Sequence, residues 1–170
     1  MSVQLKRPEQ GMKEQFEIFI NQWEQRIIPS SLENGKQSFE ELLVHLYTME
    51  NDPPRLLVPS TMFFLVEDTG KILGAIDIRH FLNEGLLKYG GHIAYGVAPD
   101  SRGQGYAKLM VDMSKDYIKS LGIDRVLICC DKENLASAKT IISCGGILES
   151  EVPRREADKE FVGQRYWVKI

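Results

Sequence analysis

The chain has 170 residues, of which 43% are apolar and 26% are charged, and its formal net charge at pH 7 is −3. This composition argues against an intrinsically disordered chain, and the weak negative charge argues against a nucleic-acid-binding surface. The length predicts a single domain over residues 1–170. No apolar stretch has the length of a signal peptide or a membrane-spanning helix, so we expect a cytoplasmic protein without membrane or nucleic-acid partners.

The first third of the chain predicts a short strand and two helices. The strand is expected at residues 4–7. Apolar side chains then recur every three or four residues, as on one face of a helix that Pro29 would end; they are Met12, Phe16, Phe19, Trp23 and Ile27. Ser38 and Glu41 have the spacing of a capping box, and the apolar residues around them predict a second helix over residues 39–49.

The rest of the chain combines hairpins with one strand–helix–strand crossover. Two apolar runs flank Asp68-Thr69-Gly70, which is a hairpin signal. Strands are then expected at residues 92–97 and 125–131, each followed by a helix, at residues 106–121 and 135–144. A final pair of strands is expected at residues 147–152 and 161–170. The charged segment between the last two strands is expected to be a solvent-exposed hairpin tip. This order predicts an α+β fold, with a mixed, mostly antiparallel sheet of six to seven strands and helices on both faces.

The three cysteines favour a reducing compartment. Cys129 and Cys130 are adjacent in a strand-like run, so their side chains would point to opposite faces and could not easily form a disulfide. With Cys144 the count is odd, which is typical of a cytoplasmic protein.

A glycine-rich turn, Arg102-Gly103-Gln104-Gly105-Tyr106-Ala107, connects the strand expected at 92–97 to the helix expected at 106–121. The nucleoside-triphosphate motif needs a Gly-Lys-Ser/Thr sequence that the chain lacks, and the dinucleotide fingerprint needs a third glycine where Lys108 stands. The two glycines let backbone N–H groups approach an anion at a helix N-terminus, where Arg102 adds a positive charge. The turn therefore predicts an anion site; a simple tight turn is the alternative.

Further motifs accompany this turn, which has the form [QR]-x-x-G-x-[GA] and follows Val97-Ala98-Pro99. Asn134-Leu135-Ala136-Ser137 opens a helix that Gly145-Gly146 ends. In these features the chain resembles the GNAT superfamily of acyl-CoA-dependent N-acetyltransferases. Residues 79–83, Arg-His-Phe-Leu-Asn, resemble a segment before the cofactor-binding strand in a bacterial branch of that superfamily. The resemblance implies the acyl-CoA N-acyltransferase fold.

The resemblance also implies an acyltransferase that moves acetyl from acetyl-CoA to a primary amine of a small molecule or peptide, by direct attack in a ternary complex. It implies no metal. The residues implied in cofactor binding are Val97, Ala98, Arg102, Gly103, Gln104, Gly105, Tyr106, Ala107, Asn134, Ser137 and Lys139. A backbone N–H near Val97 or Ala98 would stabilise the oxyanion, and Asn134 would cap a helix. The alternative function is a non-catalytic acyl-CoA-binding sensor module.

The residue that usually serves as the general acid in the family is missing from this chain. Many members have a tyrosine in the helix after the asparagine, which is thought to protonate the departing thiolate, and Ile141 stands at that position here. Tyr95, Tyr106 and Tyr166 are alternatives between which the sequence does not choose, and Tyr95 is our candidate.

His80 is the candidate for proton handling on the acceptor side, because an imidazole with a pKa near 6.5 suits proton transfer at neutral pH. A structural role for His80 is equally open. Arg79 and Asn83 are candidate acceptor-binding residues, although an ion pair with Asp77 is the structural alternative for Arg79. Glu67 is a further candidate base.

The amine acceptor itself is not identified by the sequence. Its choice is expected to depend on the loops at residues 29–38, 51–60 and 80–91. Members of the family often dimerise through their sheets, so a homodimer is an open expectation.

Overall fold

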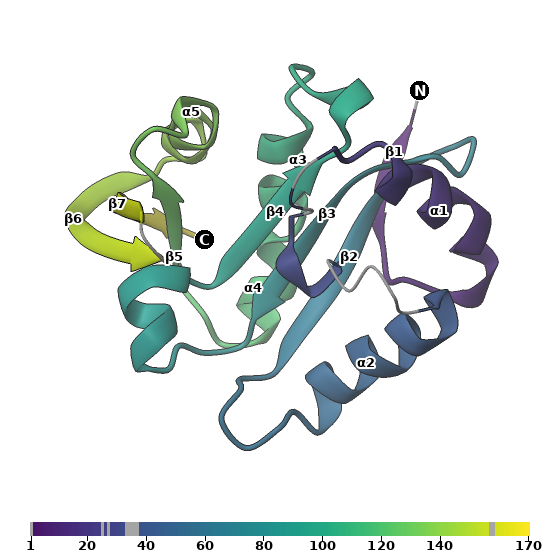
Figure 1. The fold of residues 1–170 in the computed structure, drawn as a ribbon, viewed down its shortest axis with the longest axis horizontal. Coiled ribbons are helices and arrows are strands. Elements are labelled where there is room, and N and C mark those ends of the chain that lie inside the picture. The colour runs from purple at the N-terminus through teal and green to yellow at the C-terminus, as the bar shows by residue number, and fades with distance from the viewer. Residues whose placement is uncertain (1, 25, 27, 33–37, 157–158) are drawn as a thin grey trace.

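The structure, a computed structural model, describes residues 2–24, 26, 28–32, 38–156 and 159–170 (Figure 1). The strands of these residues form two antiparallel sheets. The first sheet contains, in this order, β1 (Val3–Lys6), β2 (Ser60–Glu67), β3 (Ile72–Arg79) and β4 (Ile93–Val97). The second contains, in this order, β5 (Arg125–Asp131), β7 (Lys159–Lys169) and β6 (Ile147–Glu156).

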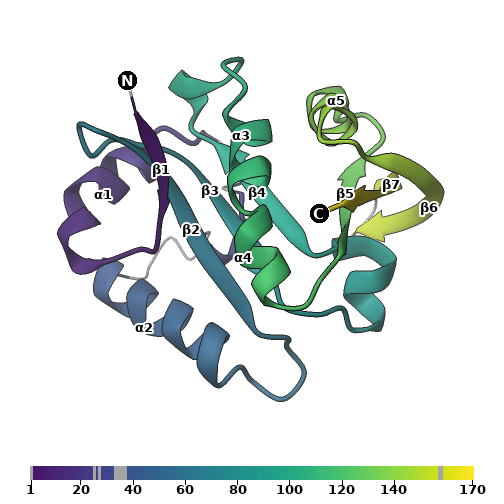
Figure 2. The ribbon, with the colours of Figure 1, turned by 180° about the vertical axis from the view of Figure 1, so that it is seen from behind.

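Helices cover both faces of the four-stranded sheet (Figures 1 and 2). One face carries α1 (Lys13–Asn21) and α2 (Phe39–Asn51), and the opposite face carries α3 (Tyr106–Met113) and α4 (Lys115–Ser120), whereas α5 (Leu135–Ser143) packs beside β5. Short 3-10 helices lie at Gln10–Met12, Ser30–Leu32 and Pro99–Ser101, and a π-helix lies at Leu86–Gly90. The predicted α+β fold is confirmed. Within the described part of the chain, no helix combines the length and the apolar character needed to cross a bilayer.

Each face of the four-stranded sheet has its own buried apolar core. On the first face, the rings of Phe16 and Phe19 from α1 pack against Phe64 of β2, with the Phe16 and Phe64 centroids 5.8 Å apart. On the other face, Met110 of α3 and Ile76 of β3 are both fully buried in the second core. The two cores hold β3 and the edge strand β4 in a fixed position.

Strand β4 lies beside β5 of the other sheet, and His92 joins the two strands at one end. The His92 N–H donates to the Leu127 carbonyl at 2.7 Å, and the Leu127 N–H donates to His92 Nδ1 at 2.9 Å. Burial lowers the pKa of His92 to about 4, so the ring is neutral and able to accept. Beyond this clamp the strands belong to different sheets, and a cavity of about 200 Å³ lies between residues 93–95 and 128–131.

Two helix predictions differ from the structure. Helix α1 ends at Asn21, so the prediction that it continues to Pro29 is wrong; Ile27 lies outside the described residues. The helix expected at 106–121 is interrupted at Ser114, whose hydroxyl donates to the Val111 carbonyl at 2.9 Å. A serine that bonds back to its own helix in this way commonly bends it.

The last hairpin is longer than predicted. Strand β6 continues through the segment expected to be the tip, and β7 begins two residues before the expected start. The partner strand supplies the pairing, since Arg155 lies opposite Glu160 in the ladder. Residues 157–158, between the two strands, lie outside the described residues.

Candidate active site

A groove of about 710 Å³ runs between β4, the glycine-rich turn and α5. We call it the β4–α5 groove. Its described lining residues are Trp23, Ile28, Tyr95, Gly96, Val97, Ser101, Arg102, Gly103, Gly105, Tyr106, Ala107, Asn134, Ala136, Ser137, Lys139 and Thr140. Ten of the thirteen residues proposed from the sequence for the cofactor or for catalysis are among them.

The glycine-rich turn has the backbone conformation that its sequence suggests. Gly103 has φ +76° and Gly105 has φ +81°, both in the left-handed region that other residues seldom adopt. A Cβ atom at either position would meet nothing within 4 Å, so the space beside both glycines is open. Gly105 is also the N-cap of α3, where unpaired backbone N–H groups and the helix dipole favour an anion.

Arg102 is held at the mouth of the groove. Its Nε donates to the Val97 carbonyl at 3.3 Å, and its guanidinium lies 5.2 Å from the centroid of the Trp23 ring. The residue is exposed, so its remaining N–H donors are accessible to a bound molecule. This arrangement places a permanent positive charge beside the two left-handed glycines.

The main chain of β4 directs alternate residues to its two neighbours. The Ala98 N–H donates to the Leu73 carbonyl of β3 at 2.9 Å, and the Arg79 N–H donates to the His92 carbonyl at 2.8 Å. In an antiparallel ladder these pairs alternate, so residues 94 and 96 also bond to β3. Tyr95 and Val97 therefore direct their N–H and C=O groups to the β5 side.

Tyr95 brings a phenol to α5. Its hydroxyl lies 2.9 Å from Ser137 Oγ, and both residues line the β4–α5 groove and the cavity between β4 and β5. Burial raises the pKa of Tyr95 to about 12, although the hydrogen bond to Ser137 opposes this effect. Ile141, at the family's usual tyrosine position, is fully buried in the core. Strand β4 thus brings a protonated phenol to the groove, whereas α5 has Ile141 at the family's usual tyrosine position.

Asn134 is the N-cap of α5. Its Oδ1 accepts a hydrogen bond from the Ser137 N–H at 3.1 Å, and the residue lines both cavities. The capping role expected from the sequence is confirmed, while its amide group stays within reach of the groove.

The remaining cofactor candidates lie outside the groove. Ala98 is fully buried, and its N–H is bonded to β3. Gln104 is exposed in the turn and does not line the groove.

Six of the described groove residues were not proposed from the sequence: Trp23, Ile28, Gly96, Ser101, Ala136 and Thr140. Trp23 and Ile28 are the two that lie farthest from the motifs in the chain. Trp23 was counted on a helix face, but α1 ends before it, and residues 23 and 28 cross β4 instead. The crossing depends on Gly96, because a Cβ there would lie 2.1 Å from the Ile28 carbonyl oxygen. A lone glycine inside a strand is a known sign of such a close approach, and it is the signal that could have found this contact.

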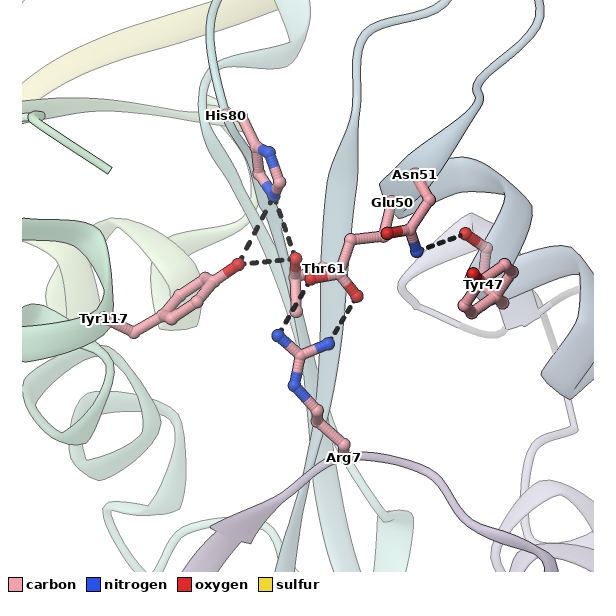
Figure 3. Close-up of polar contacts among 7 residues, drawn as sticks. All are labelled: Arg7, Tyr47, Glu50, Asn51, Thr61, His80 and Tyr117. Carbon is pink, nitrogen blue, oxygen red and sulfur yellow. Dashed lines mark hydrogen bonds and ion pairs between the residues drawn. The ribbon is translucent and has the colours of Figure 1, made fainter. Parts of the chain in front are cut away.

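His80 lies in a separate polar cluster at the end of β3 (Figure 3). Its Nε2 is 2.9 Å from Thr61 Oγ1 and 3.4 Å from the Tyr117 hydroxyl. Arg7 forms a bidentate pair with Glu50 beside them, with Nη2 donating to Oε1 at 2.8 Å. Burial lowers the pKa of His80, and the charges of Glu50 and Asp77 oppose this effect. His80 thus contacts Thr61 and Tyr117, whereas Tyr95 contacts Ser137, so the two candidate catalytic residues are not brought together.

Arg79 and Asn83 line a second pocket, of about 430 Å³, on the α2 side of the sheet. We call it the Asp77 pocket. Its described lining residues are Ser30, Ser31, Leu46, Met49, Leu57, Val58, Ser60, Asp77, Arg79, Asn83, Gly85 and Leu86. The three loops expected to select the acceptor all contribute to it, apart from residues 33–37, which lie outside the described residues. Arg79 Nη1 donates to the carbonyls of Gly90 and Gly91, each at 3.1 Å.

Residues 11–147 match the family model described as "Acetyltransferase (GNAT) domain". No curated protein matches the sequence. Among solved structures, mutant forms of the spermidine/spermine N-acetyltransferase SpeG from Vibrio cholerae are 14% identical, with a TM-score of 0.68 over 99% of this chain and 95% of that chain. An acetyltransferase of the GNAT family from Streptococcus pneumoniae is 13% identical, with a TM-score of 0.71 over 99% of both chains. At these identities the structural likeness shows the fold alone.

Proposed function

Because this chain belongs to the GNAT acetyltransferase family, we propose that it transfers acetyl from acetyl-CoA to a primary amine of a small molecule or peptide. The observation that carries the proposal is the β4–α5 groove, where a left-handed glycine turn with open space beside it and a protonated phenol share one cavity. The SpeG structures are of enzymes whose name describes acetylation of polyamines, which supports a small amine as the acceptor class.

The residues of the groove fit acetyl-CoA in three respects. The space beside Gly103 and Gly105 is open, so phosphate oxygens can approach the backbone N–H groups of the turn. Arg102 supplies a charge and unused N–H donors next to them. The Trp23 Nε1–H is buried without a hydrogen-bond partner among the described residues, and a polar group of a bound molecule would satisfy it.

We propose that the edge of β4 holds the pantetheine arm. Tyr95 and Val97 direct main-chain groups to the gap beside β5, so amides of the arm can bond to them as an added strand would. Asn134, Ser137 and Lys139 line the opposite wall of the groove and are proposed to contact the cofactor there. Because the Ala98 N–H is already bonded to Leu73, the Val97 N–H is the better candidate for oxyanion stabilisation.

Acetyl-CoA supplies the acetyl group as a thioester: a C–N bond forms, the C–S bond breaks, and of the two protons that the ammonium loses one ends on sulfur and the other in solvent. We propose that the Tyr95 hydroxyl donates the proton that reaches sulfur and regains one of the two protons that the ammonium loses. Its raised pKa keeps it protonated at neutral pH, and Ser137 Oγ, at 2.9 Å, orients it. In this role Tyr95 would replace the tyrosine that the family usually has at position 141. A proton donor at the groove favours an enzyme over a non-catalytic sensor.

His80 is proposed as a positioning residue for proton handling on the acceptor side, because it is held by Thr61 and because the neighbouring Ser60 and Arg79 line the Asp77 pocket. The His80→Gln variant keeps a hydrogen-bonding side chain but cannot titrate, so the pH dependence of turnover should shift. An unchanged pH dependence would leave His80 with a purely structural role.

Titration calorimetry tests the cofactor assignment. We expect saturable binding of acetyl-CoA by the purified protein, and no saturable binding of ATP or NAD. If the folded protein bound none of the three, the turn would be a structural feature only and the proposed function would fail.

A further inference from the structure

The Asp77 pocket is a built site that the reaction described above does not yet use. Asp77 lies on β3 with 6% of its surface exposed, and burial raises the pKa of its carboxyl group. Hydrogen bonding from Ser60 and the charge of Arg79 oppose that effect. A buried carboxylate is expensive to keep without a cationic partner, and Arg79 directs its Nη1 to backbone carbonyls of residues 90 and 91.

A second polar group in the same pocket, the buried Ser31 hydroxyl, has no hydrogen-bond partner among the described residues. Unpaired buried oxygens are uncommon in folded proteins and call for an explanation. An ammonium group has three N–H donors, which a carboxylate and a hydroxyl oxygen can accept together.

The pocket adjoins the strand that forms the cofactor groove. Asp77 lies directly opposite Ala94 of β4 in the ladder, so the two side chains project from the same face. Ala94 precedes Tyr95, and the segment that lines the groove at Ile28 lines the Asp77 pocket at Ser30 and Ser31. An amine in the pocket would therefore approach β4 from the side of the sheet opposite Tyr95.

We propose that the Asp77 pocket receives the acceptor and selects a single primary amine on an apolar chain, with the Asp77 carboxylate and the Ser31 hydroxyl binding its ammonium group. This inference rests on the proposed function and names the acceptor class for it.

The walls of the pocket explain why a monoamine is favoured. Leu46 and Met49 of α2, with Leu57, Val58 and Leu86, supply apolar surface for the chain of the acceptor. Among the described lining residues Asp77 is the one acidic side chain and Arg79 the one basic side chain. A second ammonium on the acceptor would face apolar surface or Arg79, and either environment penalises it.

Two amines with the same six-carbon chain test this selectivity. With acetyl-CoA saturating, release of the CoA thiol is followed with hexylamine or with hexamethylenediamine as acceptor. We expect kcat/KM to be about tenfold higher for hexylamine, because the second charge finds no partner. A preference for the diamine, or no turnover of hexylamine by a protein that binds acetyl-CoA, would overturn the proposal.

The Asp77→Asn variant tests the role of the carboxylate. It should lower kcat/KM for hexylamine by at least about 30-fold, because one partner of a buried charge pair is removed, while acetyl-CoA affinity is unchanged. Asp116→Asn, which alters an exposed carboxylate on α4, is the matched control and should change neither quantity. Full amine turnover by Asp77→Asn would overturn the proposal. If the wild-type protein did not bind acetyl-CoA, the proposed function itself would be overturned.

A variant at Ser31 covers the case in which Asp77→Asn does not fold. Ser31→Leu fills the pocket from a position whose hydroxyl has no hydrogen-bond partner in the described part of the chain. It should raise KM for hexylamine by at least about tenfold and leave acetyl-CoA affinity unchanged. Unaltered kinetics in Ser31→Leu would place the acceptor elsewhere.

Discussion

The Tyr95 side chain brings a phenol to the groove, whereas Ile141, at the family's usual tyrosine position, has no hydroxyl. Tyr95→Phe keeps the ring and its packing but removes the proton donor, so we expect kcat to fall about 10- to 100-fold while the Kd for acetyl-CoA stays the same. Because the Tyr95 pKa is near 12, the wild-type phenol remains protonated through the neutral range, and the decrease should not depend on pH there. Steady-state kinetics and calorimetry measure the two quantities.

Tyr166→Phe is the matched control for this variant. Its phenol is also buried, and its hydroxyl donates to Gln164 Oε1 at 2.7 Å, but it belongs to the second sheet and lines neither cavity. We expect kcat to be unchanged by Tyr166→Phe. An equal loss in both variants, or no loss in Tyr95→Phe, would contradict the assignment of Tyr95.

His92 makes stability depend on pH. Its pKa is about 4 in the folded protein and 6.5 without burial, so the unfolded chain binds the proton first as the pH falls. The free energy of unfolding should therefore decrease by about 3 kcal/mol between pH 6.5 and pH 4 through this residue, and its contribution should be complete above pH 6.5. Urea unfolding at several pH values measures the decrease.

His92→Asn isolates that contribution, because its amide oxygen can still accept from the Leu127 N–H but does not titrate. The acid-induced decrease should be smaller in this variant, whereas His45→Gln on α2 should retain it. If His92→Asn lost stability with the same pH dependence as the wild type, another group would be responsible.

At the scale of elements, the glycine-rich turn and the end of α4 offer a matched pair. Gly105 and Gly122 have φ values of +81° and +78°, and a Cβ at either would meet nothing within 4 Å. Alanine should therefore destabilise the protein by about 1 kcal/mol at each position. Only Gly105→Ala should also weaken acetyl-CoA binding, by about tenfold, because its Cβ occupies the space of the anion.

Urea unfolding and calorimetry of the two variants separate an anion site from a tight turn. Equal affinity for acetyl-CoA in Gly105→Ala, Gly122→Ala and the wild type would mean that the turn serves the backbone alone.

The elements that the sequence predicts well have local signals. Ser38 and Glu41 form the predicted capping box, with the Glu41 N–H donating to Ser38 Oγ at 3.2 Å and the Ser38 N–H donating to Glu41 Oε2 at 2.7 Å. The wrong prediction for α1 has a tertiary cause. Trp23 continues the helical spacing, but it is half-buried against β4 at Gly96, a contact between residues far apart in the sequence.

At the scale of the whole molecule, the two cavities differ in how far the sequence predicts them. The cofactor groove is built around a contiguous turn and one helix start, so local sequence motifs led to nine of its described lining residues. The Asp77 pocket joins Ser31, Met49, Asp77 and Asn83 from four separate segments, and only the fold brings them together.

Amine-dependent release of CoA thiol tests the central claim, acetyl transfer to an amine, most directly. The protein is mixed with acetyl-CoA and a panel of amines, and free thiol and acetylated amine are measured together. We predict that thiol appears faster with a suitable amine and in a one-to-one ratio with the acetylated product. If acetyl-CoA bound but no amine accelerated thiol release, the protein would be an acyl-CoA-binding sensor and the account of Tyr95 and the Asp77 pocket would be wrong.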